Sequence, residues 1–92
     1  MTEHILLADD DAELRALLKE YLQGEGFNVT GVADGEAALA AARKPAASGS
    51  EYDAIVLDIM MPGMSGTEVL KQLRKESELP VIMLTARGDD LD

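Results

Sequence analysis

The feature that most constrains this sequence is a series of short apolar runs separated by segments with helical spacing. Residues 5–8, 52–57 and 79–85 are largely apolar, and residues 27–32 form a weaker run that includes polar residues. Runs that are apolar on both faces are typical of strands in a parallel sheet that helices cover on both sides. We therefore expect four strands, the second of them at an edge of the sheet.

Three segments between these runs carry helical patterns. Leucines recur at helical spacing over residues 14–22, alanines fill residues 36–44, and Ser65-Gly66-Thr67-Glu68 has the pattern of a capping box before a third apolar face. The order β-α-β-α-β-α-β predicts an α/β fold, with one domain over residues 1–92. Right-handed crossovers would put the first helix on one face of the sheet and the other two on the opposite face.

Composition narrows the classes of function. The formal net charge is −10, which argues against nucleic-acid binding by this segment, because phosphate contacts need Lys and Arg. The chain has no cysteine, so it can form neither disulfides nor thiolate metal sites. The N-terminus does not resemble a signal peptide, and no apolar stretch reaches membrane-spanning length. We therefore expect a cytoplasmic protein with no membrane partner.

Acidic side chains follow two of the expected strands directly. Asp9 and Asp10 follow the first strand, and Asp58 follows the third. Ligands of open α/β sheets bind outside the carboxyl ends of the strands, where the strand order reverses, so we expect these carboxylates to converge. Two carboxylates about 4 Å apart repel by roughly 1 to 4 kcal/mol. Such a cluster either retains a proton or binds a cation, and its oxygen-only ligands favour a hard cation, Mg²⁺ first.

Aspartate after a strand is also a common helix N-cap, and we expect that role for Asp11 and Asp34. The same role does not fit Asp58, because the next helical pattern begins only at Ser65. Thr85 ends the fourth run, where its position suits a structural role as well as it suits the acidic pocket.

Two further features are expected to be structural. His4 precedes the first strand, at the opposite end of the sheet from the acids, and is expected to be a solvated terminal residue. The pair Met60-Met61 is expected to pack in the core and the loop rather than to contact a cofactor.

Three segments together resemble the receiver domain of two-component response regulators, in particular those of the winged-helix transcription-factor class. They are residues 5–11 (ILLADDD), residues 52–66 (YDAIVLDIMMPGMSG) and residues 80–86 (PVIMLTA). The resemblance covers the length of the chain and implies a flavodoxin-like parallel sheet with strand order 2-1-3-4. It implies a phosphorylation switch in a transcription regulator, not an enzyme.

The resemblance also implies residue roles. Asp58 would accept a phosphoryl group from a sensor histidine kinase. Asp10, Asp58 and the backbone carbonyl of Met60 would bind Mg²⁺, and Asp9 would act through water.

The switch residues follow from the same resemblance. Thr85 would bond a phosphoryl oxygen and shift inward, and Ala86 would leave room for that shift. Binding to DNA would belong to a domain outside this chain.

Receiver domains continue with a fourth helix, a fifth strand that ends in a lysine, and a fifth helix. The lysines of this chain (Lys19, Lys44, Lys71 and Lys75) all lie in helical segments, and Arg87 is expected in a solvated loop. We therefore expect an incomplete receiver domain without the catalytic lysine. Its fourth strand would be an open apolar edge, which favours self-association over a stable monomer.

Other classes of function fit less well. A Mg²⁺-dependent aspartyl phosphohydrolase would want a second acid two residues after the nucleophile, where this chain has Met60. A flavin- or nucleotide-binding module would want a small-residue loop after the first strand, where an acidic run would repel phosphate. A fragment that acts only through oligomerisation, without phosphorylation, is the other alternative.

Overall fold

The computed structural model describes residues 3–43 and 52–84 and has the expected alternation of strands and helices. The elements are β1 (His4–Ala8), α1 (Ala12–Gly24), β2 (Asn28–Val32), α2 (Gly35–Ala42), β3 (Ala54–Asp58), α3 (Gly66–Leu73) and β4 (Val81–Leu84). The last strand is shorter than the expected run, and Thr85 lies outside the described residues.

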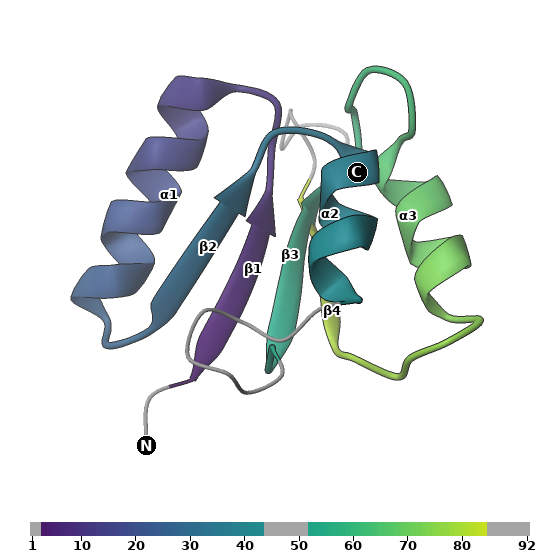
Figure 1. Ribbon diagram of the computed structural model, residues 1–92. Helices are drawn as coiled ribbons and strands as arrows, with labels where there is room; N and C mark the ends of the chain where they lie inside the picture. The colour runs from purple at the N-terminus through teal and green to yellow at the C-terminus, as the bar shows by residue number, and fades with distance from the viewer. Residues whose placement is uncertain (1–2, 44–51, 85–92) are drawn as a thin grey trace, which may run out of the picture.

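The four strands form one parallel sheet in the order β2-β1-β3-β4, as expected (Figure 1). Strand β1 pairs with β2 on one side and with β3 on the other, so the direction of winding reverses between β2 and β3. This reversal opens a crevice at the carboxyl ends of β1 and β3, which is where α/β sheets of this kind bind ligands.

The helices cover the sheet unequally. Figure 1 shows α1 on one side of the sheet and α2 with α3 on the other, as right-handed crossovers predict. Alternate residues of the strands point to opposite faces, so Leu6, Ile55 and Leu57 pack under α2 and α3. Leu7 and Val56 point to the α1 face.

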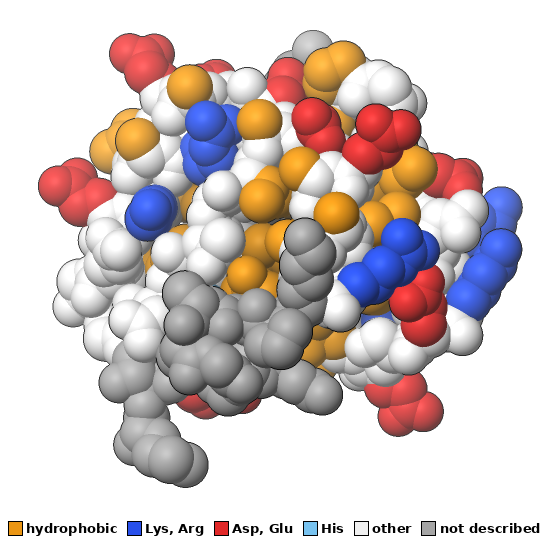
Figure 2. Space-filling model, viewed as in Figure 1, with side chains coloured by type: hydrophobic (Ala, Val, Ile, Leu, Met, Phe, Trp, Pro, Cys, Tyr) orange, Lys and Arg blue, Asp and Glu red, His pale blue; other side chains and the backbone are white. Residues whose placement is uncertain are grey.

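The core under α2 and α3 is the larger of the two. Figure 2 shows hydrophobic side chains gathered in the middle of this face, over α2, with charged side chains around them. The cluster contains Leu6, Ala8, Ala38, Leu39, Tyr52, Ile55, Leu57, Met61, Val69 and Leu73. On the other face no residue of α1 is fully buried, and its Leu17 and Tyr21 side chains are mostly exposed.

Side-chain caps begin all three helices. The Asp11 carboxylate accepts hydrogen bonds from the backbone N–H groups of Glu13 and Leu14, and the Asp34 carboxylate accepts one from Ala37. The Ser65 hydroxyl accepts one from Glu68 N–H. The predicted capping roles of Asp11, Asp34 and Ser65 are therefore confirmed.

The prediction that His4 is a solvated terminal residue is wrong. His4 begins β1 and is only 6% exposed. Its Nε2 lies 2.8 Å from Thr30 Oγ1, and its ring meets Tyr52 edge to face with centroids 5.0 Å apart. A polar partner on β2 and an aromatic partner before β3 give the imidazole a buried position that its place near the chain start does not suggest.

The β4 end of the sheet is only partly covered by the described residues. β4 is hydrogen-bonded to β3 on one side only, and its Ile82 side chain is 56% exposed. Within the residues described, no helix is long and apolar enough to cross a membrane.

Candidate functional site

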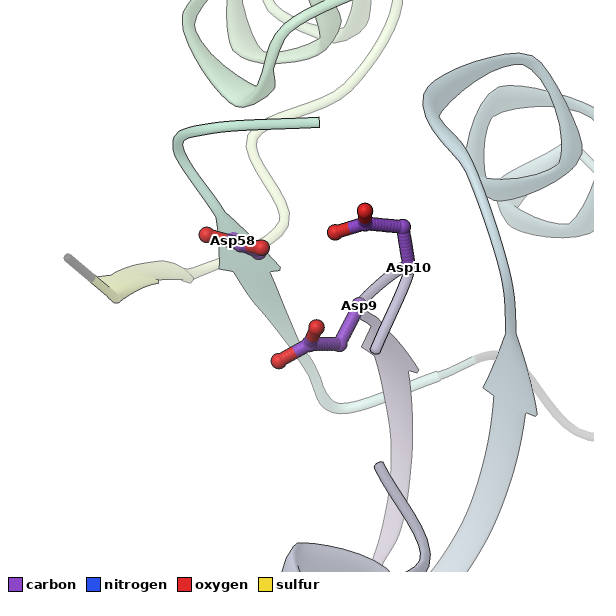
Figure 3. Close-up of side chains that lie close together, drawn as sticks. All are labelled: Asp9, Asp10 and Asp58. Carbon is purple, nitrogen blue, oxygen red and sulfur yellow. The ribbon is translucent and has the colours of Figure 1, made fainter. Parts of the chain in front are cut away.

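Three carboxylates meet at the carboxyl ends of β1 and β3. Asp58 ends β3, and Asp9 and Asp10 follow β1 directly. Because Ala8 pairs with Leu57 in the sheet, the next residues along each strand, Asp9 and Asp58, emerge side by side. Figure 3 shows the three side chains turned toward a common space. One oxygen from each can be chosen so that all lie within 4.8 Å of one another.

Local hydrogen bonds orient two of these carboxylates. Asp9 Oδ1 accepts the backbone N–H of Asp11 at 2.9 Å, and Asp58 Oδ1 accepts that of Met60 at 3.1 Å. Both bonds run from a residue two positions further on, so the turn after each strand fixes the acid that precedes it.

The second oxygen of Asp9 has no such partner. Asp9 is 1% exposed, and its Oδ2 is buried without a hydrogen bond among the described residues. A buried carboxylate oxygen without a partner is costly, unless a cation or a water molecule satisfies it.

The start of α3 lies close against the backbone of Asp58. Gly66 is buried, and its N–H donates to the carbonyl of Ile59 at 3.1 Å. A Cβ added at Gly66 would collide with the carbonyl oxygen of Asp58 and would lie 3.0 Å from the Cα of Ile59. Glycine at this position therefore lets the helix approach the strand closely enough to close the loop.

The Asp58 carboxyl is in surroundings that favour its neutral form. Burial raises the pKa of Asp58 above its ordinary value, and the negative charges of Asp9 and Asp10 raise it further. The hydrogen bond from Met60 N–H acts in the opposite direction, but the net direction is upward. A positive charge in the space between the three acids would relieve this repulsion.

The acids form one wall of a cavity of about 440 Å³. Leu14 and Leu18 of α1, together with Leu84 of β4, give the cavity apolar walls, and Met60 stands at its rim with a mostly exposed side chain. The space is therefore open enough for a small polar group to reach Asp58.

The donor set fits Mg²⁺. Its three side chains offer only oxygen, one of these oxygens is buried without a partner, and the mutual repulsion raises the pKa of Asp58. Hard divalent cations prefer such oxygen ligands.

The structure confirms the convergence expected from the sequence and corrects one detail. Asp9, Asp10 and Asp58 meet as predicted, and Asp11 caps α1. Of the methionine pair, Met61 is in the core as predicted, but Met60 is 63% exposed, so its expected packing is wrong. The role of the Met60 carbonyl stays a prediction, and Thr85, Ala86 and Arg87 lie outside the described residues.

Sequence reasoning missed two residues near the site. Gly66 was read only as part of a capping-box pattern, although glycine in a first helical turn is itself a signal of close packing. Arg15 lies between the leucines of the first helical pattern, and its Nη1 donates to the backbone carbonyl of Asp9 at 2.7 Å. No pattern in the sequence points to that contact.

Comparison with known proteins agrees with this geometry. The family model described as the response regulator receiver domain matches residues 5–92. The chain belongs to this family. The transcriptional regulatory protein CpxR of Klebsiella pneumoniae (strain HS11286) is 52% identical over 88 residues, which cover 96% of this chain and 35% of the relative. The receiver domain described here thus spans about a third of the length of that curated relative.

Solved structures show the same receiver fold. The response regulator protein TrrA from Thermotoga maritima, in complex with Mg²⁺-BeF, has a TM-score of 0.81 and 38% identity, covering 98% of this chain and 75% of that one. A structure of the histidine kinase ThkA in complex with TrrA gives a TM-score of 0.78 and 41% identity, covering 92% of this chain and 70% of that one. The chain is therefore a receiver domain of two-component response regulators with the expected strand order.

Proposed function

We propose that Asp58 is the phosphoryl acceptor of this receiver domain and that a sensor histidine kinase is the donor. The observation that carries the proposal is the convergence of Asp9, Asp10 and Asp58 at the carboxyl ends of β1 and β3. All three line the cavity, but Asp58 ends a different strand and lies opposite the Asp9–Asp10 pair (Figure 3), and Met60 N–H orients its Oδ1. A solved complex between a response regulator and a histidine kinase supports this choice of donor.

The phosphoryl group comes from a phosphohistidine of the kinase, and the transfer needs no oxidant or reductant. A carboxylate oxygen of Asp58 forms a bond to the phosphorus of a phosphohistidine as the P–N bond breaks. The electron pair of that bond leaves with the imidazole nitrogen, which is protonated from water. The domain is then the substrate of a kinase and not an enzyme acting on other molecules.

The neighbouring acids would hold a divalent cation. We assign Asp10, Asp58 and the backbone carbonyl of Met60 as direct ligands, with Asp9 acting through water. When bound, Mg²⁺ would screen the negative charge of the acceptor and of the incoming phosphoryl group. The unpartnered Asp9 Oδ2 and the raised pKa of Asp58 support this assignment.

The remaining parts of the proposal extend beyond the described site. Thr85 and Ala86 directly follow β4 and would respond to the phosphoryl group as switch residues. The similarity to a transcriptional regulatory protein supports a cytoplasmic parent that binds DNA through another domain. The partly bare sheet near β4 supports self-association of this chain through that edge.

Intact-mass measurement tests the acceptor. The full-length parent protein that carries this domain is incubated with Mg²⁺ and acetyl phosphate, and we expect the mass of a single phosphoryl group to be added. Asp58→Ala should abolish the gain, and Asp10→Asn should reduce it strongly because a cation ligand is lost. The control Asp11→Asn should keep the gain, since asparagine also caps a helix.

Two results would contradict the proposal. One is a wild-type protein that gains no mass under these conditions. The other is an Asp58→Ala variant that still gains a phosphoryl group at a nearby aspartate.

A further inference from the structure

Arg15 makes a contact with the acidic site that the proposed function does not use. It lies in the first turns of α1, which runs alongside β2 (Figure 1). Its backbone N–H donates to the carbonyl of Asp11 at 2.8 Å as the helix begins, and its side chain turns back toward the end of β1. There Nη1 donates to the backbone carbonyl of Asp9 at 2.7 Å in a partly buried position. This short bond from a cation joins α1 to the peptide between Asp9 and Asp10.

The Arg15 side chain passes close to Gly31 of β2. A Cβ added at Gly31 in β2 would be 3.3 Å from Arg15 Cδ, 3.5 Å from Cγ and 3.8 Å from Nε. The stem of the arginine therefore passes over Gly31, the one glycine of the described strands. A methyl group at position 31 would force the stem to shift by a few tenths of an ångström, and a branched side chain would force it further.

The bond from Arg15 to the Asp9 carbonyl lies in the segment that carries two of the three acids. The Asp9 carbonyl belongs to the peptide that leads into Asp10, while the Asp9 carboxylate is held by the N–H of Asp11. The Asp9 N–H in turn donates to the carbonyl of Val32 at 3.2 Å. Arg15 is thus the side chain from α1 that holds this turn, beside the Asp9 carboxylate within the turn and the Val32 carbonyl on β2.

We propose that Arg15 is a positioning residue for the cation site, holding the Asp9–Asp10 peptide so that both carboxylates face Asp58. This inference rests on the proposed function, since it concerns the same cation site. Groups that orient metal ligands typically change metal affinity about 10-fold or more when they are removed. The opposite effect is expected if the arginine acts only as a nearby charge, because removing a cation strengthens the binding of another.

The test compares matched variants in a Mg²⁺ titration followed by backbone amide resonances. We expect Arg15→Gln to weaken Mg²⁺ binding about 10-fold. Arg15→Lys keeps the charge but loses the planar fork, and should recover part of the affinity. Gly31→Ala displaces the guanidinium without any change of charge and should weaken binding in the same direction.

Arg74→Gln is the control. Arg74 also donates to a backbone carbonyl, that of Ser77 at 3.1 Å, but it caps the far end of α3. The control therefore removes the same charge and the same kind of bond away from the site, and should leave the Mg²⁺ affinity unchanged.

Hydrogen exchange of the metal-free protein gives a second readout. The N–H of Asp11, which donates to the Asp9 carboxylate, should exchange faster in Arg15→Gln and in Gly31→Ala, while the N–H groups of the buried β1 strand should not. This local effect separates positioning from general loss of stability.

The outcomes separate the inference from the proposed function. A wild-type protein that does not respond to Mg²⁺ would contradict the proposed cation site, and the exchange of the Asp11 N–H would still decide the role of Arg15. Unchanged or tighter Mg²⁺ binding in Arg15→Gln, with normal exchange at Asp11, would overturn the inference. If Arg15→Gln does not fold, Gly31→Ala decides it alone.

Discussion

The Asp58 carboxyl lies in surroundings that favour its protonated form. Burial and the charges of Asp9 and Asp10 raise its pKa. The folded protein therefore binds this proton more tightly than the unfolded chain does. Below the ordinary pKa of 3.8 the group makes no difference to stability. As the pH rises from there through the raised value, the folded state loses stability, and the full penalty applies above it.

Because ionisation of Asp58 destabilises the folded protein, removal of its charge in Asp58→Asn should be stabilising. Asparagine keeps an oxygen for the Met60 N–H but removes the charge. In the absence of divalent cations we expect the variant to be more stable at pH 7, by on the order of 1 kcal/mol, the lower end of the repulsion between carboxylates about 4 Å apart. The gain should shrink as the pH falls and should be close to zero at pH 3, below the ordinary pKa of 3.8.

Urea denaturation at both pH values measures the effect. Mg²⁺ should stabilise the wild type and not the variant, which provides the internal control. Equal stability of the two proteins at pH 7 would show that the three acids do not repel as the geometry requires.

Among the elements, α3 lies directly against the backbone of Asp58. The contact between Gly66 and the backbone of Asp58 and Ile59 leaves no room for a methyl group. We expect Gly66→Ala to destabilise the protein by roughly 1 to 3 kcal/mol, the usual cost of overpacking. Denaturation in urea at fixed pH provides the measurement.

Gly24→Ala is the matched control for that variant. Gly24 ends α1, and a Cβ added there would meet nothing within 4 Å. This substitution should be neutral or stabilise the protein by up to about 1 kcal/mol, because alanine restricts the unfolded chain. A Gly66→Ala variant as stable as Gly24→Ala would refute the close approach of α3 to β3.

The elements themselves were largely predictable from the sequence, because each depends on local signals. Apolar runs marked the strands, and the caps Asp11, Asp34 and Ser65 marked the helix starts. The convergence of the acids followed from topology alone. The burial of His4 was not predictable in this way, because its partner Thr30 is distant in sequence. The bond from Arg15 to Asp9 was not predictable either, because its acceptor is a backbone carbonyl, which has no sequence signature.

For the molecule as a whole, the helices cover the sheet unequally, and this affects how the chain associates with other copies of itself. β4 pairs with β3 alone among the described strands, and its Ile82 is mostly exposed. An apolar edge strand is a template for pairing with another chain. We expect this 92-residue chain to self-associate, measured by light scattering after size exclusion.

A charge on that edge should reduce the association. Ile82→Lys places a lysine where edge strands commonly carry one as protection. The control is Thr67→Lys on the exposed surface of α3, which adds the same charge elsewhere and should leave the association unchanged. A wild type that runs as a clean monomer with a sharp thermal transition would refute the expectation.

The two faces of the sheet also differ in how well they tolerate substitutions. Under α2 and α3, Leu6, Ile55 and Leu57 are completely enclosed, so any change of volume there has to be accommodated by neighbours that are already in contact. Along α1, Leu17 and Tyr21 are largely in solvent and can change size at little cost. Lineages of this domain can therefore diverge most freely along α1, the helix that also borders the acidic cavity through Leu14 and Leu18. Substitutions along α1 can therefore change the surface beside the cavity without altering the core that holds Asp58 in place.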